Sequence, residues 1–182
     1  MSWSRRRVLE AGGWAALSAA GVLADSAGAR EALETRRIAL KNLHTPETLD
    51  LVFRRGPQYV PEALRAVQVL LRDYRSGEQH PIDPGLLDYL YDVARAAGAD
   101  PVFSVISGYR SPETNRMLHE RSNGVASKSL HMEGRAIDVR LAGVDCADLA
   151  AHALGMQRGG VGYYRQSDFV HLDTGKFRSW RG

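Results

Sequence analysis

The sequence predicts an α+β fold in which a small, mostly antiparallel sheet packs against several helices. Three observations lead to this fold class. Short runs that alternate apolar and polar residues occur in both halves of the chain and predict strands. Segments with apolar residues at helical spacing lie between these runs and are bounded by proline and glycine. Some of the strands follow one another closely, which favours antiparallel pairing.

The first half of the chain predicts a hairpin followed by two helices. Residues 36–45 and 47–56 are short alternating runs, and Pro46 and the polar residues beside it separate them, as in a β-hairpin. Residues 61–75 begin with a proline and place apolar residues at helical spacing, which predicts an amphipathic helix. Residues 83–100 predict a second helix, which begins at a capping residue, Asp83.

The second half predicts strands and helices that alternate around one irregular loop. The loop is rich in glycine and serine and shows no clear period, whereas its neighbours are regular. In chain order, the sequence predicts a buried strand that runs into a turn at Gly108 (101–111), a helix (111–122), the loop (123–134), a strand (135–143), a helix (144–159) and two strands (159–166 and 168–175). The last two strands are expected to pair antiparallel.

The composition is that of a single globular domain. The chain has 182 residues, of which 44% are hydrophobic and 25% charged, and its net charge is +3. Basic residues are scattered beyond the N-terminus, so we expect no nucleic-acid partner. The single cysteine, Cys146, cannot form an internal disulfide bond.

Residues 1–29 predict an export signal of the twin-arginine type. Arg5, Arg6 and Arg7 precede a short apolar run that is rich in alanine and glycine, and the run ends near an Ala-Gly-Ala cleavage site. The run is shorter and less hydrophobic than the roughly 20 residues of a membrane span. An ordinary amphipathic first helix and an uncleaved, anchored signal are the alternatives. Cleavage would leave residues 30–182 with no stable membrane partner.

Three polar residues near two predicted strands form a candidate metal site. His131 and Asp138 are separated by six residues, and His171 lies in the last predicted strand. Strand alternation places Asp138 and His171 on the faces opposite the core residues, so both can face one groove. Two imidazoles and one carboxylate are the protein ligands expected of catalytic zinc. Ordinary hydrogen-bonded histidines are the alternative, and the spacing alone leaves it open.

Three sequence blocks resemble the M15-type zinc peptidases that cut peptidoglycan: ISGYRSPETN, SKSLHMEGRAIDVR and GGVGYYRQSDFVHLDTG. The resemblance covers nearly all of residues 30–182. It implies one Zn²⁺ per chain, held by His131, Asp138 and His171, and a substrate-binding role for Arg110. Arg110 follows a predicted strand, where its guanidinium could hold a peptide carboxylate, although a surface salt bridge is the alternative.

Two aspartates are candidates for the catalytic base, which takes a proton from water and passes it to the leaving amine. Asp173 shares a strand face with His171 and could instead orient a ligand histidine. Asp168 lies three residues before His171, where related M15 enzymes often carry an acidic base. Simple strand alternation turns Asp168 away, unless a bulge redirects it. Both residues therefore remain candidates.

The resemblance implies a single zinc peptidase domain, residues 30–182, that acts in the periplasm. Its expected reaction is hydrolysis of amide bonds in the cross-links between peptidoglycan stem peptides, by a metal-activated water. A zinc D,D-carboxypeptidase or dipeptidase is an alternative, because the sequence does not show the shape of a pocket. A non-catalytic cell-wall binding module is another. We expect a monomer.

Overall fold

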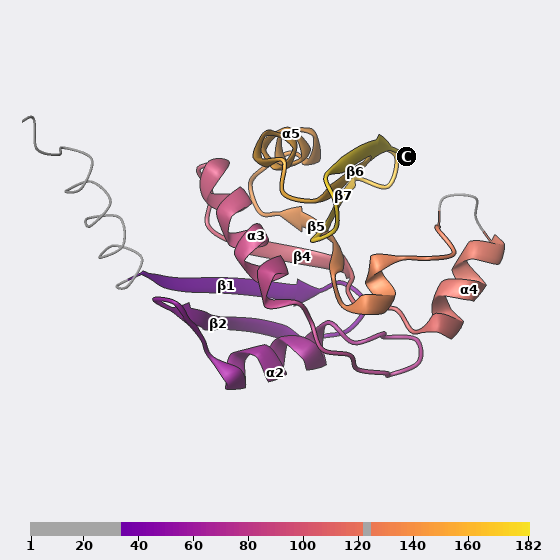
Figure 1. Cartoon of the computed structure of the whole chain (residues 1–182), viewed down its shortest axis with the longest axis horizontal. Helices are drawn as coiled ribbons and strands as arrows, with labels where there is room; N and C mark the ends of the chain where they lie inside the picture. Colours follow the sequence, from indigo (N-terminus) through magenta and orange to yellow (C-terminus); the bar gives the residue numbers. More distant parts are fainter. Residues whose placement is uncertain (1–33, 122–124) are drawn as a thin grey trace, which may run out of the picture.

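A computed structural model describes residues 34–121 and 125–182 of the chain (Figure 1). Within them, eight strands form one sheet in the order β3-β2-β1-β4-β5-β7-β6-β8. The strands are β1 (Thr35–Asn42), β2 (Thr48–Arg55), β3 (Gln58–Tyr59), β4 (Val102–Ser107), β5 (Ala136–Leu141), β6 (Gly160–Tyr164), β7 (Phe169–Asp173) and β8 (Arg178–Arg181). The β1–β4 and β6–β8 pairs are parallel, and the other neighbours are antiparallel.

The expected small, mostly antiparallel sheet is therefore wrong, because the sheet has eight strands and is mixed. Two strands escaped prediction because they are too short to show a period: β3 has two residues and β8 has four. The parallel β1–β4 pair joins Ala39 to Val102, and β6–β8 joins Gly162 to Trp180. Such pairings between distant segments leave no mark in a local pattern.

Four helices and one 3-10 helix accompany the sheet in the described residues. They are α2 (Pro61–Leu70), α3 (Pro84–Ala96), α4 (Pro112–Arg121), η1 (Leu130–Glu133) and α5 (Cys146–Met156). Helix α2 contacts β2, α3 contacts β1, and α5 contacts β5, β6 and β7. Helix α4 lies at one end of the molecule, at the right of Figure 1.

The two helices of the first half differ in how well the sequence predicted them. Helix α3 begins as expected, because the Asp83 carboxylate accepts a hydrogen bond of 2.9 Å from the Gly85 amide. Helix α2 ends at Leu70 and not at residue 75. Just beyond it, the Asp73 carboxylate accepts hydrogen bonds from the amide and hydroxyl of Ser111. This contact holds residues 71–75 against the start of α4, so these residues do not continue the helix.

The core lies between the sheet and the helices α2, α3 and α5. Strand alternation decides which residues enter it: Ile137, Val139 and Leu172 are fully buried. The intervening residues, which include Asp138 and His171, lie on the other face. Because the helices cover one face of β5 and β7, the opposite face is left for the candidate site.

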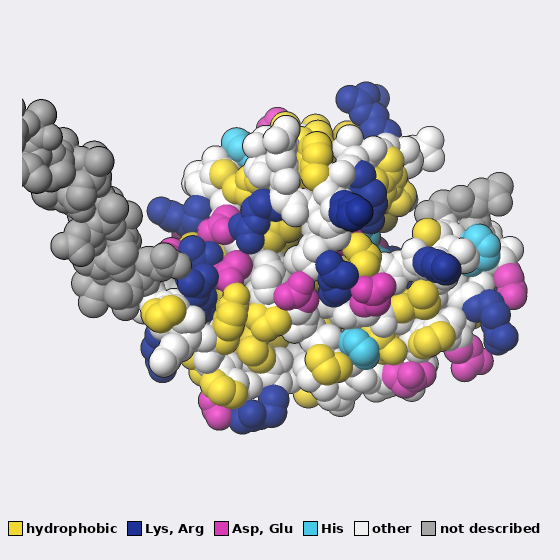
Figure 2. Space-filling view, viewed as in Figure 1, with side chains coloured by type: hydrophobic (Ala, Val, Ile, Leu, Met, Phe, Trp, Pro, Cys, Tyr) yellow, Lys and Arg dark blue, Asp and Glu magenta, His cyan; other side chains and the backbone are white. Residues whose placement is uncertain are grey.

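The surface shows no separation of charges on the face drawn in Figure 2, where acidic side chains are interspersed among basic ones. Within residues 34–121 and 125–182, no helix has the length and apolar character that a membrane crossing requires. The predicted export signal, residues 1–29, lies outside the described residues.

Candidate metal centre

Two of the three predicted ligands lie directly opposite each other on adjacent strands. Asp138 of β5 pairs with His171 of the antiparallel strand β7. Residues opposite each other in an antiparallel pair lie on the same face with Cβ atoms about 5 Å apart. The strand register therefore brings the carboxylate and the imidazole together, on the common face that alternation predicted.

The third predicted ligand, His131, lies in the 3-10 helix η1, before β5. The helix is capped by Ser129, whose hydroxyl accepts a hydrogen bond from the His131 amide. It ends at Gly134, which has a φ of 65°. A Cβ on Gly134 would clash with the Pro81 carbonyl oxygen. The glycine is thus needed for a left-handed turn pressed against the neighbouring loop, and the turn fixes where His131 enters the site.

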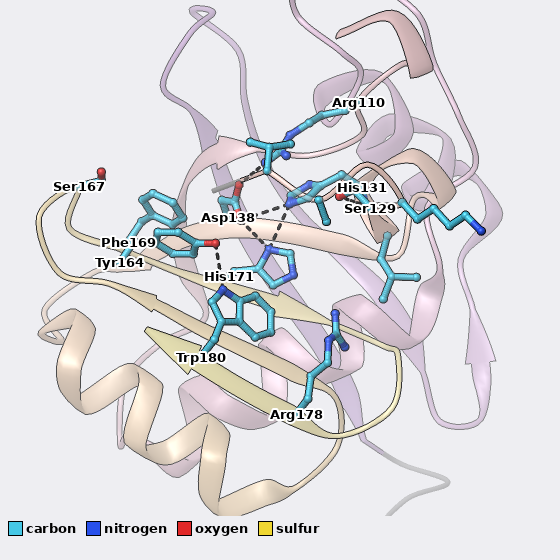
Figure 3. A pocket seen from close by; sticks show the side chains of 14 residues that line it. Arg110, Ser129, His131, Asp138, Tyr164, Ser167, Phe169, His171, Arg178 and Trp180 are labelled. Atoms are coloured by element: carbon cyan, nitrogen blue, oxygen red, sulfur yellow. Dashed lines mark hydrogen bonds and ion pairs between the residues drawn. The ribbon is translucent and has the colours of Figure 1, made fainter. Parts of the chain in front are cut away.

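The ligand atoms of the three residues converge on one point (Figure 3). His131 Nε2 is 3.1 Å from His171 Nδ1 and 3.2 Å from Asp138 Oδ1. His171 Nδ1 is 2.8 Å from Asp138 Oδ1. In a tetrahedral zinc site with bonds of about 2.1 Å, the ligand atoms lie about 3.4 Å from one another. The three side chains therefore fit a zinc ion after shifts of a few tenths of an ångström.

Each histidine is held through the ring nitrogen that points away from the convergence. His131 Nδ1 is 2.7 Å from the Gly108 carbonyl oxygen, and His171 Nε2 is 3.1 Å from Asp173 Oδ2. A carbonyl or carboxylate partner keeps the proton on the outer nitrogen and leaves the inner one free to bind a metal. Such outer hydrogen bonds are typical of histidines that bind metals.

Burial and neighbouring charges shift the pKa values of His131, Asp138 and His171 in different directions. Burial is the largest influence on His131 and lowers its pKa. Burial also opposes ionisation of Asp138, but the two histidines outweigh it and hold the pKa of this carboxyl well below its usual range. For His171, burial acts against the charged form, yet hydrogen bonds to Asp138 and Asp173 raise the pKa. His131 is therefore shifted toward its neutral form and His171 toward its charged form, beside an ionised Asp138.

Arg110 lies at this centre and is not a surface residue. Its Nη2 donates a hydrogen bond of 2.7 Å to Asp138 Oδ2, and its Nε donates one of 3.0 Å to the Ser107 hydroxyl. Its backbone amide donates to the His131 carbonyl oxygen. The guanidinium therefore holds the carboxylate oxygen that faces away from the histidines, and it also lines the adjoining cavity.

The two candidate bases differ in burial: Asp173 is buried and Asp168 is exposed. Asp173 is fully buried and accepts hydrogen bonds from the amides of Gly160 and Gly175 and from the guanidinium of Arg178. Although burial raises the pKa of a carboxyl, His171 and these donors together hold the pKa of Asp173 below its usual range. It contacts His171 but does not line the cavity.

Asp168 lies in the turn between β6 and β7, with a positive φ of 51°. Its side chain is 67% exposed and forms an ion pair of 3.2 Å with Arg140. It does not line the cavity either. Among the described residues that line the cavity, Asp138 is the only one with a carboxylate.

A cavity of about 480 Å³ opens beside the three ligands. Its charged residues, apart from the ligands, are Arg110, Lys128 and Arg178, and its aromatic residues are Tyr164, Phe169 and Trp180. Sequence reasoning missed Arg178 and Trp180, which lie on β8. A tryptophan flanked by arginines in a short polar segment was the available signal, but nothing placed that segment beside β6.

Two imidazoles and one carboxylate beside an open cavity are typical of catalytic metal sites and not of closed structural ones. Comparison with known proteins then identifies the family. A family model described as peptidoglycan L,D-endopeptidase MepK, of the M15 peptidases, matches residues 30–180. The chain therefore belongs to this family of M15 peptidases.

Individual relatives agree with the family model. The peptidoglycan L,D-endopeptidase MepK of Escherichia coli strain K12 is 41% identical over 177 residues, which cover 97% of each chain. The probable peptidoglycan L,D-endopeptidase MepK of Haemophilus influenzae is 38% identical over 148 residues, 81% of this chain and 80% of the relative. No solved structure gives a significant match.

Proposed function

We propose that the chain is a zinc-dependent peptidoglycan endopeptidase that hydrolyses amide bonds in the cross-links between stem peptides. The observation that carries this function is the convergence of His131, Asp138 and His171 beside a cavity, in a member of the M15 peptidases. The relatives are named L,D-endopeptidases, so the proposed bond joins an L-centre to a D-centre.

The donor set suits one zinc ion per chain. Two neutral imidazole nitrogens and a carboxylate oxygen are ligands that zinc accepts readily, and their spacing is close to that of a tetrahedral site. When bound, zinc supplies a Lewis acid that polarises a carbonyl and lowers the pKa of water. The protein supplies the orientation: the Gly108 carbonyl holds His131, and the Asp173 carboxylate holds His171.

Arg110 has two tasks in this proposal. Its Nη2 and Nε hold Asp138 and Ser107, which keeps the inner carboxylate oxygen directed at the histidines. Its remaining edge lines the cavity, where it can attract a carboxylate of the substrate. Together with Lys128 and Arg178, it makes the cavity cationic, which suits the carboxylate-bearing stem peptides of peptidoglycan.

We assign Asp173 the role of orienting His171 and not that of the catalytic base. Its burial, its hydrogen bond to His171 and its ion pair with Arg178 support this role and leave no side that faces the cavity. Asp168 stays the rival base, because it lies three residues before His171 and its carboxylate is exposed.

The place of action follows from the substrate. Peptidoglycan lies outside the cytoplasmic membrane, so the enzyme is proposed to work in the periplasm as a monomer, after export through the twin-arginine signal in residues 1–29. Fusing residues 1–29 to a reporter that is active only after twin-arginine export tests this part. Export that persists when Arg5 and Arg6 are both changed to lysine would exclude a twin-arginine route.

Digestion of intact, cross-linked peptidoglycan tests the central proposal, with the products identified by mass. We expect cross-linked muropeptides to become uncrosslinked ones, and purified protein to carry one zinc per chain. Removal of zinc by a chelator should stop the reaction, and added zinc should restore it. Release of terminal residues alone indicates a carboxypeptidase or dipeptidase, and binding without any new product indicates a cell-wall binding module.

A further inference from the structure

Tyr164 contributes a phenol to the cavity beside the candidate metal centre. It lines the cavity together with the three ligand residues. Figure 3 shows its hydroxyl directed toward the side of the cavity where His171 and Asp138 lie. The tyrosine belongs to β6, which pairs with the ligand-bearing strand β7.

Tyr164 is held in place from two directions. Its ring stacks on Phe169, with ring centroids 4.5 Å apart and planes inclined by 14°. Its hydroxyl oxygen lies 3.0 Å from the indole nitrogen of Trp180. A hydroxyl that is fixed in this way is oriented before any substrate binds, and such orientation makes a donor effective in catalysis.

The direction of the bond to Trp180 decides what Tyr164 can offer to a ligand. An indole N–H is a donor only, so the Tyr164 oxygen must accept. The hydroxyl proton is then free for another acceptor, and among the described residues Tyr164 donates to none. This proton is available on the cavity side of the tyrosine.

Trp180 can reach Tyr164 because of a glycine on the neighbouring strand. Gly162 of β6 pairs with Trp180 of β8, and a Cβ on Gly162 would clash with the indole ring. The indole also lies against the His171 imidazole, with ring centroids 5.1 Å apart. The tryptophan therefore links the phenol to a ligand histidine, and the glycine makes room for it.

Three other polar groups at the cavity already have partners within the protein. Arg110 is bonded to Asp138 and Ser107, and Arg178 is bonded to Asp173. The Ser129 hydroxyl caps η1. Tyr164 differs from these three because its ring is stacked on Phe169 and its hydroxyl, which accepts from Trp180, donates to no described residue.

We propose that Tyr164 is a catalytic residue that donates a hydrogen bond to the carbonyl oxygen of the scissile amide, and that Trp180 is its positioning residue. As water adds to the carbonyl carbon, negative charge develops on this oxygen, and the phenol stabilises it without giving up its proton. The C–N bond then breaks, and the amine leaves with a proton that comes from water. This role rests on the proposed endopeptidase function.

The test compares wild-type protein with Tyr164→Phe and with Tyr163→Phe as a matched control. Tyr163 is the adjacent residue on β6, but it packs against the core and does not line the cavity. On a cross-linked muropeptide we expect kcat of Tyr164→Phe to fall roughly 100-fold, with KM and bound zinc unchanged. The control variant keeps the wild-type kcat.

A double-mutant cycle extends the test to Trp180→Phe, which keeps a ring but removes the N–H. We expect a smaller fall in kcat, and the double variant should be no slower than Tyr164→Phe alone, because both changes remove the same interaction. Bound zinc is measured for every variant. Wild-type kcat in a zinc-loaded Tyr164→Phe protein overturns the role of Tyr164, and losses that multiply in the double variant overturn that of Trp180.

The controls separate this inference from the function on which it rests. If the wild-type protein and Tyr163→Phe both leave cross-linked muropeptides intact, the endopeptidase function itself is wrong, and the role of Tyr164 falls with it. If both cleave and Tyr164→Phe cleaves equally fast, only the role of Tyr164 is wrong.

Discussion

Two buried carboxylates, Asp88 on α3 and Asp138 on β5, have different kinds of partners. Asp88 accepts hydrogen bonds from the guanidinium groups of Arg36, at 2.9 Å, and Arg54, at 3.2 Å, and from the Tyr59 hydroxyl. Every partner of Asp88 in this cluster is a donor with a proton to give. Asp138 has one such partner, Arg110, and its other oxygen faces two imidazoles.

The difference separates a cluster that the protein's own donors satisfy from one that suits a metal ion. The protein's own cations and hydroxyl satisfy Asp88, so nothing further is needed there. At Asp138, the His131 nitrogen that faces the carboxylate carries a lone pair when the outer nitrogen holds the proton for Gly108. Lone pairs that face a carboxylate oxygen repel it unless a cation lies between them. For recognising a metal site, the number of buried charges is therefore less informative than whether each acceptor faces a donor.

The largest expected effect is at the metal centre, for His171→Ala. We expect the variant to lose bound zinc and to cleave cross-linked muropeptides at least about 1,000-fold more slowly, because metal catalysis contributes several kcal/mol. Zinc content and turnover are measured on the same sample, with circular dichroism as the check on folding. A folded His171→Ala protein that cleaves at the wild-type rate would remove the centre from the mechanism.

The second prediction concerns the Asp88 cluster. Asp88→Asn removes the buried carboxylate that Arg36 and Arg54 share, and Arg36 keeps its more exposed partners Glu34 and Asp92. We expect the free energy of unfolding to fall by about 3 kcal/mol. Denaturant unfolding measures this fall, while zinc content should stay unchanged. The control is Arg65→Ala, which breaks an exposed pair with Glu62 and should cost less than about 1 kcal/mol. Loss of zinc from a folded Asp88→Asn protein would contradict the separation of the two clusters.

The third prediction separates Asp173 from Asp168. Asp173→Asn should weaken zinc binding by about 10- to 100-fold, because it removes the charge that orients His171. Asp168→Asn should bind zinc as the wild type does, since Asp168 contacts no ligand residue among the described contacts. Titration with a competing chelator measures the affinity. Wild-type affinity in Asp173→Asn would argue against its orienting role.

Turnover of the zinc-loaded variants then addresses the base. A large fall in kcat for Asp168→Asn with normal zinc affinity identifies Asp168 as the group that moves the proton. Normal turnover in that variant removes Asp168 from this role. The same comparison on Asp173→Asn, saturated with zinc, shows whether it does more than orient His171.

The smallest expected effect concerns a third buried carboxylate, Asp73, which resembles Asp88 in having donors as partners. Burial raises the pKa of this carboxyl, but hydrogen bonds from Thr114, Ser111 and the Arg75 amide outweigh burial and lower the pKa from 3.8 to about 2. The ionised group therefore stabilises the folded state above about pH 4, and this contribution disappears as the pH falls from 4 to 2.

Comparison with Asp73→Asn isolates this contribution. The wild-type advantage in the free energy of unfolding should be up to about 2 kcal/mol at pH 5 and should shrink toward pH 2.5. Denaturant unfolding at the two pH values measures it. An advantage that does not change with pH would mean that Asp73 acts through packing and not through its charge.

Much of the site followed from the sequence because the relevant order is local. Alternation along β5 and β7 places Asp138 and His171 on one face, and the structure pairs the two residues directly. Pro84 and Asp83 marked the start of α3 correctly. In each case, the signal and the element lie within a few residues of each other.

What could not be predicted depends on contacts between distant segments. The position of β8 beside β6 rests on side chains such as Trp180, which fits over Gly162 only once both strands are formed. The environment of Asp173 likewise needs Arg178 and the turn at Gly175. Asp168 has a positive φ, which the alternation of apolar and polar residues does not predict. A local pattern therefore finds the candidate ligands but not the residues that contact them.

The distance along the chain between His131 and His171 has a consequence for the unfolded state. The two residues are 40 positions apart, and the chain has one cysteine and so no internal disulfide bond. A zinc ion held by both histidines would close a loop of this length, as a covalent cross-link does. For a loop of 40 residues, the lost chain entropy corresponds to about 4 kcal/mol. The zinc ion would thus act as a reversible cross-link in addition to its role in the reaction. Zinc-depleted protein should therefore unfold at a lower temperature.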